Sequence, residues 1–123
     1  MIEYDFKNQE IADIVNSIII YAVSKRASDI HFDPSENGLR VRLRIDGLLQ
    51  DHAIVPQAYQ RNLTTRIKLI SNMNITESRL PQDGAIKGNI NGINLDMRVS
   101  SLTTNLGEKI VFVSLIILKV QMV

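Results

Sequence analysis

The chain has 123 residues and a mass of 13.9 kDa, the size of one ordinary domain, so we expect a single domain over residues 1–123. Hydrophobic residues make up 45% of it and cysteine is absent, which excludes cysteine-ligated metal centres and thiol nucleophiles. Fourteen Lys and Arg against thirteen Asp and Glu give a net charge of +1, so we expect no nucleic-acid partner and only local anion sites.

The N-terminus lacks the basic start and apolar centre of a signal peptide, and no apolar run is long enough to span a bilayer. We therefore expect a cytoplasmic chain.

Two amphipathic helices are predicted, the first over residues 9–25 behind Asn8 as N-cap and the second after Pro56. The apolar stripe of the second helix consists of Tyr59, Leu63, Ile67 and Ile70. The basic residues largely off this stripe are interpreted as a solvated face: Arg61, Arg66 and Lys68.

Between these helices the apolar period changes to two, which is typical of half-buried strands. Strands are predicted over residues 29–33 and 39–45, joined by a loop over 34–38, and Asp46-Gly47 marks a tight turn after the second strand. The polar face of the second strand carries Arg40, Arg42 and Arg44. The expected register pairs Asp33 with Arg40, His31 with Arg42 and Asp29 with Arg44. This arrangement is interpreted as a cross-strand ion-pair ladder.

A second hairpin is predicted around Asn91-Gly92, a favoured two-residue loop. Pairing outward from it places core-compatible residues on one face: Ile90 with Ile93, Gly88 with Leu95, and Ile86 with Met97. The other face pairs Asn89 with Asn94, Lys87 with Asp96 as its counter-ion, and Ala85 with Arg98. Arg98 therefore has no carboxylate opposite it. Residues 110–117 are predicted to form a central strand, and the whole is expected to be α+β, with about six mainly antiparallel strands and two flanking helices.

No constellation for enzyme chemistry is complete in this sequence. Gly107-Glu108-Lys109 lacks the preceding glycine and following Ser or Thr of a phosphate-binding P-loop. His31 and His52 fall short of a metal-ligand set, so His31 is interpreted as a hydrogen-bonded structural residue. A dense polar segment, Glu77 to Gly84, precedes a predicted strand and is interpreted either as a polar turn or as part of a site.

Five strings occur in the order seen in the secretion ATPases of type II secretion and type IV pilus assembly. They are Ala27-Ser28-Asp29-Ile30-His31-Phe32-Asp33-Pro34, Arg42-Leu43-Arg44-Ile45-Asp46-Gly47, Arg79-Leu80-Pro81-Gln82-Asp83-Gly84, Asp96-Met97-Arg98-Val99-Ser100 and Gly107-Glu108-Lys109. The chain resembles that family over about residues 10–113. The resemblance implies the PAS-like domain that precedes the ATPase core, with residues 114–123 as a linker or divergent tail.

The resemblance also implies a mechanism. In the family, ATP and Mg²⁺ are held by the P-loop core domain, and arginines of the preceding domain close over the phosphates as a hexameric ring turns over. Arg98 and Arg79 are the expected nucleotide-contacting residues, and Gln82, Asp83 and Gly84 are expected to shape the turn. The implied partners are the P-loop core domain, neighbouring subunits of the ring, and inner-membrane secretion or pilus platform proteins. The chain by itself holds no cofactor and is not expected to hydrolyse ATP.

Three positions depart from the family pattern: Ala85 and Val113 replace arginines, and Thr103 replaces a proline. Half of the expected anion clamp is therefore missing. A divergent ATPase with a weaker clamp, or a truncated or degenerate product, would both fit these changes. The alternative function is a stand-alone PAS-like module that binds a protein or a small ligand.

Overall fold

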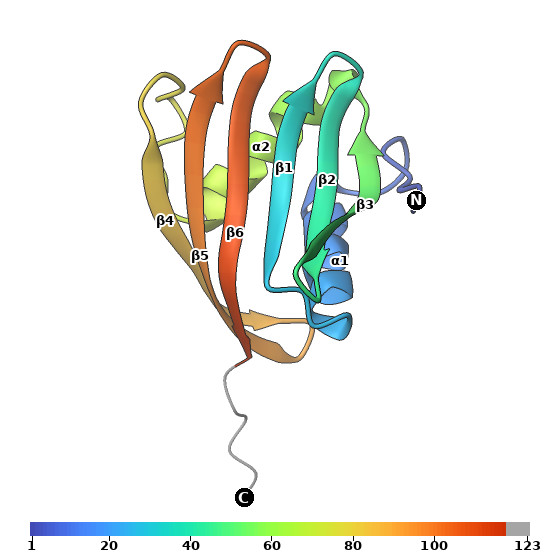
Figure 1. Ribbon diagram of the computed structural model, residues 1–123. Coiled ribbons are helices and arrows are strands. Elements are labelled where there is room, and N and C mark those ends of the chain that lie inside the picture. The colour runs from blue at the N-terminus through green and yellow to red at the C-terminus, as the bar shows by residue number, and fades with distance from the viewer. Residues whose placement is uncertain (118–123) are drawn as a thin grey trace, which may run out of the picture.

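The computed structural model describes residues 1–117, which form two helices and six strands. In chain order these are α1 (Ile11–Ser24), β1 (Asp29–Ser35), β2 (Gly38–Ile45), β3 (Leu48–Val55), α2 (Gln57–Ile70), β4 (Gln82–Ile90), β5 (Ile93–Thr104) and β6 (Gly107–Ile117). The strands form one sheet in the order β3-β2-β1-β6-β5-β4, and every neighbouring pair is antiparallel. Both helices lie on the same side of the sheet (Figure 1), so its other face is open. The predicted α+β architecture is confirmed.

The first helix begins two residues later than the sequence predicts. Asn8 was expected to cap it, but the Asn8 side-chain amide donates to Asp5 Oδ2 at 2.9 Å, and Glu10, with ψ of 141°, is the last extended residue before the helix. The N-cap assignment is therefore wrong, because Asn8 belongs to the preceding turn. The helix ends where Arg26 adopts a left-handed φ of 56° and the Ala27 N–H donates to the Ala22 carbonyl at 2.9 Å.

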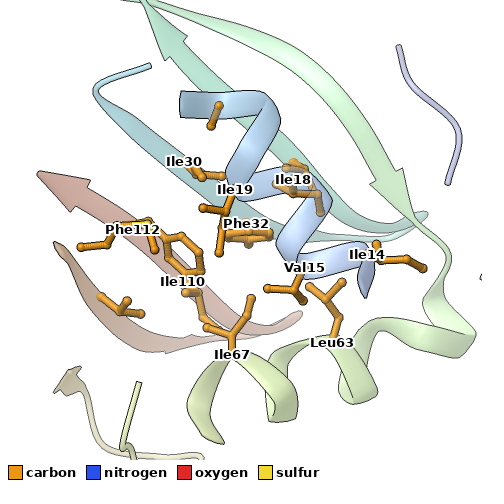
Figure 2. Close-up of a cluster of buried hydrophobic side chains, with 14 of the residues drawn as sticks. Ile14, Val15, Ile18, Ile19, Ile30, Phe32, Leu63, Ile67, Ile110 and Phe112 are labelled. Atoms are coloured by element: carbon orange, nitrogen blue, oxygen red, sulfur yellow. The ribbon is translucent and has the colours of Figure 1, made fainter. Parts of the chain in front are cut away.

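The core lies between the helices and the covered face of the sheet. Figure 2 shows side chains of α1, α2 and two central strands meeting there, and those labelled are buried. The rings of Phe32 on β1 and Phe112 on β6 lie 5.0 Å apart at a tilt of 53°, a favourable aromatic geometry. The labelled core residues are Ile14, Val15, Ile18, Ile19, Ile30, Phe32, Leu63, Ile67, Ile110 and Phe112. Since β1 and β6 are the central pair, this packing joins the first and last strands of the sheet.

Both predicted hairpins have the expected register. In the first, β1 pairs with β2 as predicted, although β1 continues to Ser35 and leaves only Glu36-Asn37 as the turn. In the second, Asn91 and Gly92 take φ values of 49° and 89°, the left-handed conformation that a tight hairpin loop of this kind requires. The three cross-strand pairs expected on each face of the β4–β5 hairpin are present.

The predicted strand over residues 110–117 is β6, which starts earlier, at Gly107, and lies between β1 and β5. Residues 114–117 continue this strand, while residues 118–123, the remainder of the expected linker or tail, lie outside the described residues. No helix within residues 1–117 is both long and apolar enough to cross a membrane.

Candidate functional site

The open face of the sheet carries a row of arginines on β2, and every one of them is paired. Arg42 Nη2 lies 2.7 Å from Asp33 Oδ2, and Arg44 Nε lies 3.2 Å from Asp29 Oδ2. Arg40 was expected to pair with Asp33 but instead contacts Asp51 Oδ1 on β3 at 2.7 Å. The predicted ladder therefore exists, with one partner supplied by the strand on the far side of β2. We call Arg40, Arg42 and Arg44 with these three aspartates the arginine ladder.

The acidic members of the ladder are held as carboxylates. Burial by itself raises the pKa of Asp33, but a hydrogen bond from Arg42 and the charge of Lys109, whose Nζ lies 3.4 Å from Asp33 Oδ1, outweigh burial and hold the pKa below its ordinary value. Burial likewise raises the pKa of Asp29, and hydrogen bonds from Ser28, His31 and Arg44 outweigh it. His31 hydrogen-bonds Asp29, as expected for a structural histidine. Within the described residues, no three His, Asp or Glu side chains gather as metal ligands.

Arg98 lies on the same open face, in the middle of β5, and its surroundings differ. Its neighbours in register are Ala85 on β4 and Val113 on β6, the two positions at which the family resemblance led us to expect arginine. The side chain is exposed, and among residues 1–113 it makes no ion pair or side-chain hydrogen bond. Within residues 1–113, Arg98 is thus an unpaired guanidinium flanked on both sides by small or apolar residues.

A hollow of about 560 Å³ lies beside Arg98, between the edge strand β4 and the end of α2. Its wall is fixed by a close approach: a Cβ added at Gly84 would lie 2.3 Å from the Ser71 carbonyl oxygen, so only glycine fits. The Ala85 N–H donates to the same carbonyl at 3.3 Å. The hollow is lined by Ile70, Ser71, Asn72, Asp83, Gly84, Ala85, Lys87 and Arg98.

Lys87 also borders this hollow, and the prediction that Asp96 is its counter-ion is wrong. The two residues are opposite each other in register, but no ion pair joins them. Lys87 is exposed, whereas Asp96 is partly buried and its Oδ1 has no hydrogen-bond partner. Register sets the distance between the two Cα atoms, while the side-chain rotamers decide whether the charged ends meet.

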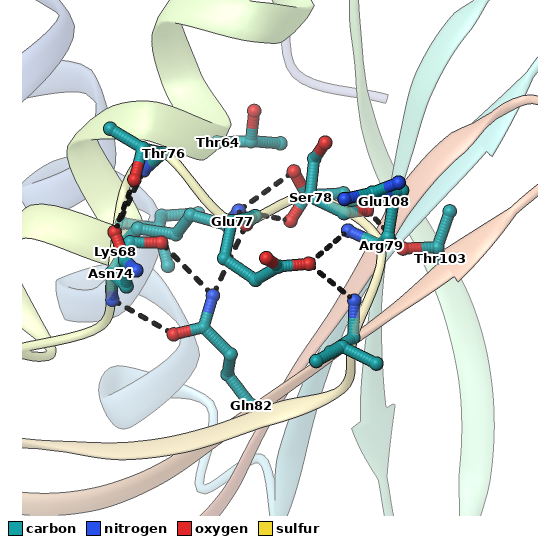
Figure 3. Close-up of polar contacts among 12 residues, drawn as sticks. Thr64, Lys68, Asn74, Thr76, Glu77, Ser78, Arg79, Gln82, Thr103 and Glu108 are labelled. Carbon is teal, nitrogen blue, oxygen red and sulfur yellow. Dashed lines mark hydrogen bonds and ion pairs between the residues drawn. The ribbon is translucent and has the colours of Figure 1, made fainter.

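The other expected nucleotide-contacting residue, Arg79, lies on the loop between α2 and β4 (Figure 3). The Glu77 carboxylate accepts the backbone N–H groups of Arg79 and Leu80 at 2.9 and 2.8 Å, and these bonds lower the pKa of Glu77. Arg79 itself is exposed. Arg79 is not among the residues that line the hollow beside Arg98.

The residues expected to shape the turn lie in strand β4 instead, at its start. Gln82 nevertheless holds the loop, because its Oε1 accepts the Asn74 N–H at 2.8 Å and its Nε2 donates to the carbonyls of Asn74 and Glu77 at 3.0 and 3.2 Å. Gly84 provides the close approach to α2, and Asp83 points to the open face, opposite Ser100.

The structure corrects one residue of the supposed solvated face of α2. Lys68 is only 2% exposed, and its Nζ lies 2.6 Å from Glu108 Oε2 on β6 and donates to the Glu77 carbonyl at 2.6 Å (Figure 3). This buried pair ties α2, the 71–81 loop and β6 together. The helical period could not reveal it, because Lys68 is next to Ile67 at the border of the stripe and its partner is 40 positions away.

Sequence comparison relates this arrangement to known proteins. Residues 5–121 match the family described as Type II/IV secretion system protein. Over 98 residues the chain is 45% identical to the type II secretion system protein E of Xanthomonas campestris pv. campestris, covering 80% of this chain and 17% of that protein. Over 102 residues it is 43% identical to the type IV pilus assembly ATPase PilB of Myxococcus xanthus, covering 82% and 18%. The chain thus spans about a fifth of the length of these relatives.

Solved structures share the fold. The Legionella pneumophila ATPase DotB aligns with a TM-score of 0.62 and 15% identity, over 90% of this chain and 31% of that chain. The pilus retraction motor PilT, solved with bound ADP, aligns with a TM-score of 0.53 and 18% identity, over 83% and 29%. At this level of identity the likeness concerns the fold.

Proposed function

Because the chain belongs to the type II/IV secretion system protein family, we propose that it is the regulatory domain preceding the ATPase core of a secretion or pilus-assembly ATPase. In this proposal its arginine contacts the phosphates of ATP held by the core domain, and the domain moves with the hydrolysis cycle of a hexameric ring. Neighbouring subunits and inner-membrane platform proteins are its further partners, and it acts in the cytoplasm at that membrane.

The observation that carries the proposal is the isolation of Arg98. Every arginine of β2 has a carboxylate within 3.2 Å, whereas Arg98 on the same face has no partner in residues 1–113. A guanidinium is always charged and presents a planar fork of donors that matches two phosphate oxygens. Strand β5 pairs with β4 on one side and with β6 on the other, and its register with β6 shifts between Asp96 and Arg98, so Arg98 lies beside an irregularity that can direct its side chain. These properties suit contact with a phosphate brought by another domain.

The division of labour between the domains follows from what this chain offers. Gly107-Glu108-Lys109 begins β6 directly after a hairpin turn, so it is not the strand–loop–helix setting of a P-loop, and Glu108 is engaged by Lys68. No acidic cluster for Mg²⁺ is present in the described residues. The residues of this chain fit contact with the phosphates and no other part of the reaction. The core domain would hold ATP and Mg²⁺ and would supply the metal-assisted phosphoryl transfer. Arg98 would stabilise charge on the transferring group.

The test uses a chimera in which this chain replaces the matching 98 residues of the Xanthomonas type II secretion protein. Arg98→Ala should lower ATP turnover by roughly 10²–10³-fold, the effect of removing one donor from a transition-state clamp. The matched control is Arg40→Ala, an exposed arginine of the same face whose partner is a structural aspartate, and it should retain turnover within about twofold. Equal turnover with and without Arg98 would contradict the proposal.

The isolated chain gives an independent measurement. One exposed arginine supplies about 1–3 kcal/mol through charged hydrogen bonds, which corresponds to an affinity no tighter than about millimolar. Calorimetry with ATP should therefore detect no tighter binding. Micromolar affinity would place the main nucleotide site in this chain and would favour the alternative, a stand-alone ligand-binding module.

A further inference from the structure

A second cation that forms no ion pair within residues 1–113 lies beside Arg98. Lys87 is on β4, two positions from Ala85 on the same open face, and is the diagonal cross-strand neighbour of Arg98 because its direct partner is Asp96. Diagonal neighbours in an antiparallel pair lie about 7–8 Å apart at Cα, within reach of long side chains. Lys87 and Arg98 also line the same hollow. The two positive charges can therefore address one anion.

The cations around the hollow are not held in ion pairs within the described residues. On the ladder side of the sheet each arginine has an aspartate, and Lys109 shares Asp33. Two cations and one carboxylate, Asp83, line the hollow, and Asp83 is diagonal to Arg98 on its other side. A second carboxylate, Asp96, is directly opposite Lys87 but does not line the hollow, and within the described residues neither aspartate forms an ion pair with Lys87 or Arg98. Because neither cation is held by a carboxylate, both side chains can turn toward an arriving anion.

We propose that Lys87 is the second phosphate-contacting cation of this domain and takes the place of the arginine missing at position 85. This inference rests on the proposed function and deepens it by naming a further residue that meets the phosphate chain of the nucleotide. Ala85 lines the same hollow, and its small methyl group leaves room there for an anion beside Lys87 and Arg98. Arg98 supplies the two-pronged contact, and the Lys87 ammonium supplies a mobile point charge with three donors on a long stem.

Asp83 has the opposite effect on the same anion. Its carboxylate lines the hollow and repels phosphate, so it weakens the attraction that the two cations create. The arrangement therefore predicts changes of opposite sign at two positions of one strand: removal of the Lys87 charge weakens anion binding, and removal of the Asp83 charge strengthens it. A general loss of structure would not produce this pair of signs.

The test titrates the full 123-residue chain, labelled with ¹⁵N, with inorganic triphosphate at low ionic strength and follows the amide signals of Ala85 and Arg98. We expect saturable shifts with millimolar affinity. Lys87→Met should weaken this affinity roughly three- to tenfold, Lys87→Arg should restore it, and Asp83→Asn should tighten it about twofold or more. The matched control is Lys7→Met, at an exposed lysine on the N-terminal segment, which should change nothing.

The outcomes separate this inference from the proposed function. If Lys87→Met behaves like Lys7→Met while Arg98→Ala abolishes the shifts, the second cation is wrong and the role of Arg98 stands. If no saturable shift occurs at Ala85 or Arg98, the two-cation site is overturned, and the chimera's loss of turnover in Arg98→Ala still decides the proposed function. If turnover of the chimera is unchanged in Arg98→Ala while Lys87→Met loses the triphosphate-induced shifts, the proposed function is wrong. The two cations would then still form an anion site, but one that does not serve ATP turnover.

Discussion

The arginine ladder on β2 and Arg98 on β5 lie on the same open face of the same sheet, yet within residues 1–113 only the ladder arginines have carboxylate partners. In the ladder, Arg42 contacts Asp33 at 2.7 Å and both side chains are partly buried. Arg98 has Ala85 and Val113 beside it and is exposed. An arginine that has a carboxylate partner stabilises its own sheet, whereas one without a partner remains available to a ligand or another domain.

The difference comes from the neighbouring strands. Strand β2 lies between β1 and β3, and both supply aspartates to its open face. Strand β5 lies between β4 and β6, which present Ala85 and Val113 at that level. A paired surface arginine contributes little, but a half-buried pair costs more to break because the remaining charge loses its compensation.

The most strongly paired cation, Lys68, should give the largest loss of stability. Lys68→Met should lower the free energy of unfolding by about 2–4 kcal/mol, because it leaves the Glu108 carboxylate in a largely buried position without its cation. Urea denaturation of the 123-residue chain measures this change. The double variant with Glu108→Leu should recover part of the loss, and a double variant as unstable as the sum of the two single ones would show that the pair is not coupled.

In the ladder, Asp33→Asn should cost about 1–2 kcal/mol, since it removes the partner of Arg42 and of Lys109 together. Arg98→Ala should stay within about 0.5 kcal/mol of the original chain, because no partner is left behind. Urea denaturation of the two variants side by side is the direct test of the comparison. A larger loss at Arg98 than at Asp33 would invert it.

Acid should remove the stabilisation that the arginine ladder provides, whereas Arg98 should contribute nothing to the pH dependence of stability. The folded-state pKa values of Asp29 and Asp33 lie below their ordinary values, so the unfolded chain binds protons first as the pH falls. The stabilisation is complete above about pH 4 and is lost as the pH falls further, through the lowered folded-state values. Urea denaturation across this pH range should show that Asp33→Asn loses less unfolding free energy on acidification than the original chain. Arg98→Ala should show the same pH dependence as the original chain. Identical profiles for all three chains would contradict the pairing.

The smallest effect should come from giving Arg98 a partner. Ala85→Glu places a carboxylate directly across the strand pair from Arg98 and should stabilise the fold by about 0.5 kcal/mol. The same variant should weaken the triphosphate-induced shifts at Arg98, because its guanidinium is then engaged. Ala85→Gln, similar in size but uncharged, is the control and should leave both the stability and the shifts nearly unchanged.

Much of the fold could be predicted from local patterns. The alternation over residues 39–45 and the Asn91-Gly92 turn sufficed for both hairpin registers, including the position of Arg98 opposite Ala85. Turn type and side-chain alternation are properties of neighbouring residues along the backbone, so they can be read before any tertiary contact is known. The cap at Asn8 failed because a competing local bond to Asp5 was equally available.

The sequence by itself therefore determined both helices, most of the strands, the registers of two hairpins and which of their side chains share the open face, whereas strand β3 after the Asp46-Gly47 turn was not identified. Only the tertiary structure decided which charges meet: Arg40 with Asp51 instead of Asp33, Lys68 buried against Glu108, and Lys87 left without Asp96. The physical reason is that strand periodicity is set by the backbone, whereas an ion pair needs two rotamers to converge and often a partner from a strand or helix distant in the chain. Lys87, Arg98 and Asp83 line the hollow without forming ion pairs with one another because their side-chain rotamers do not converge.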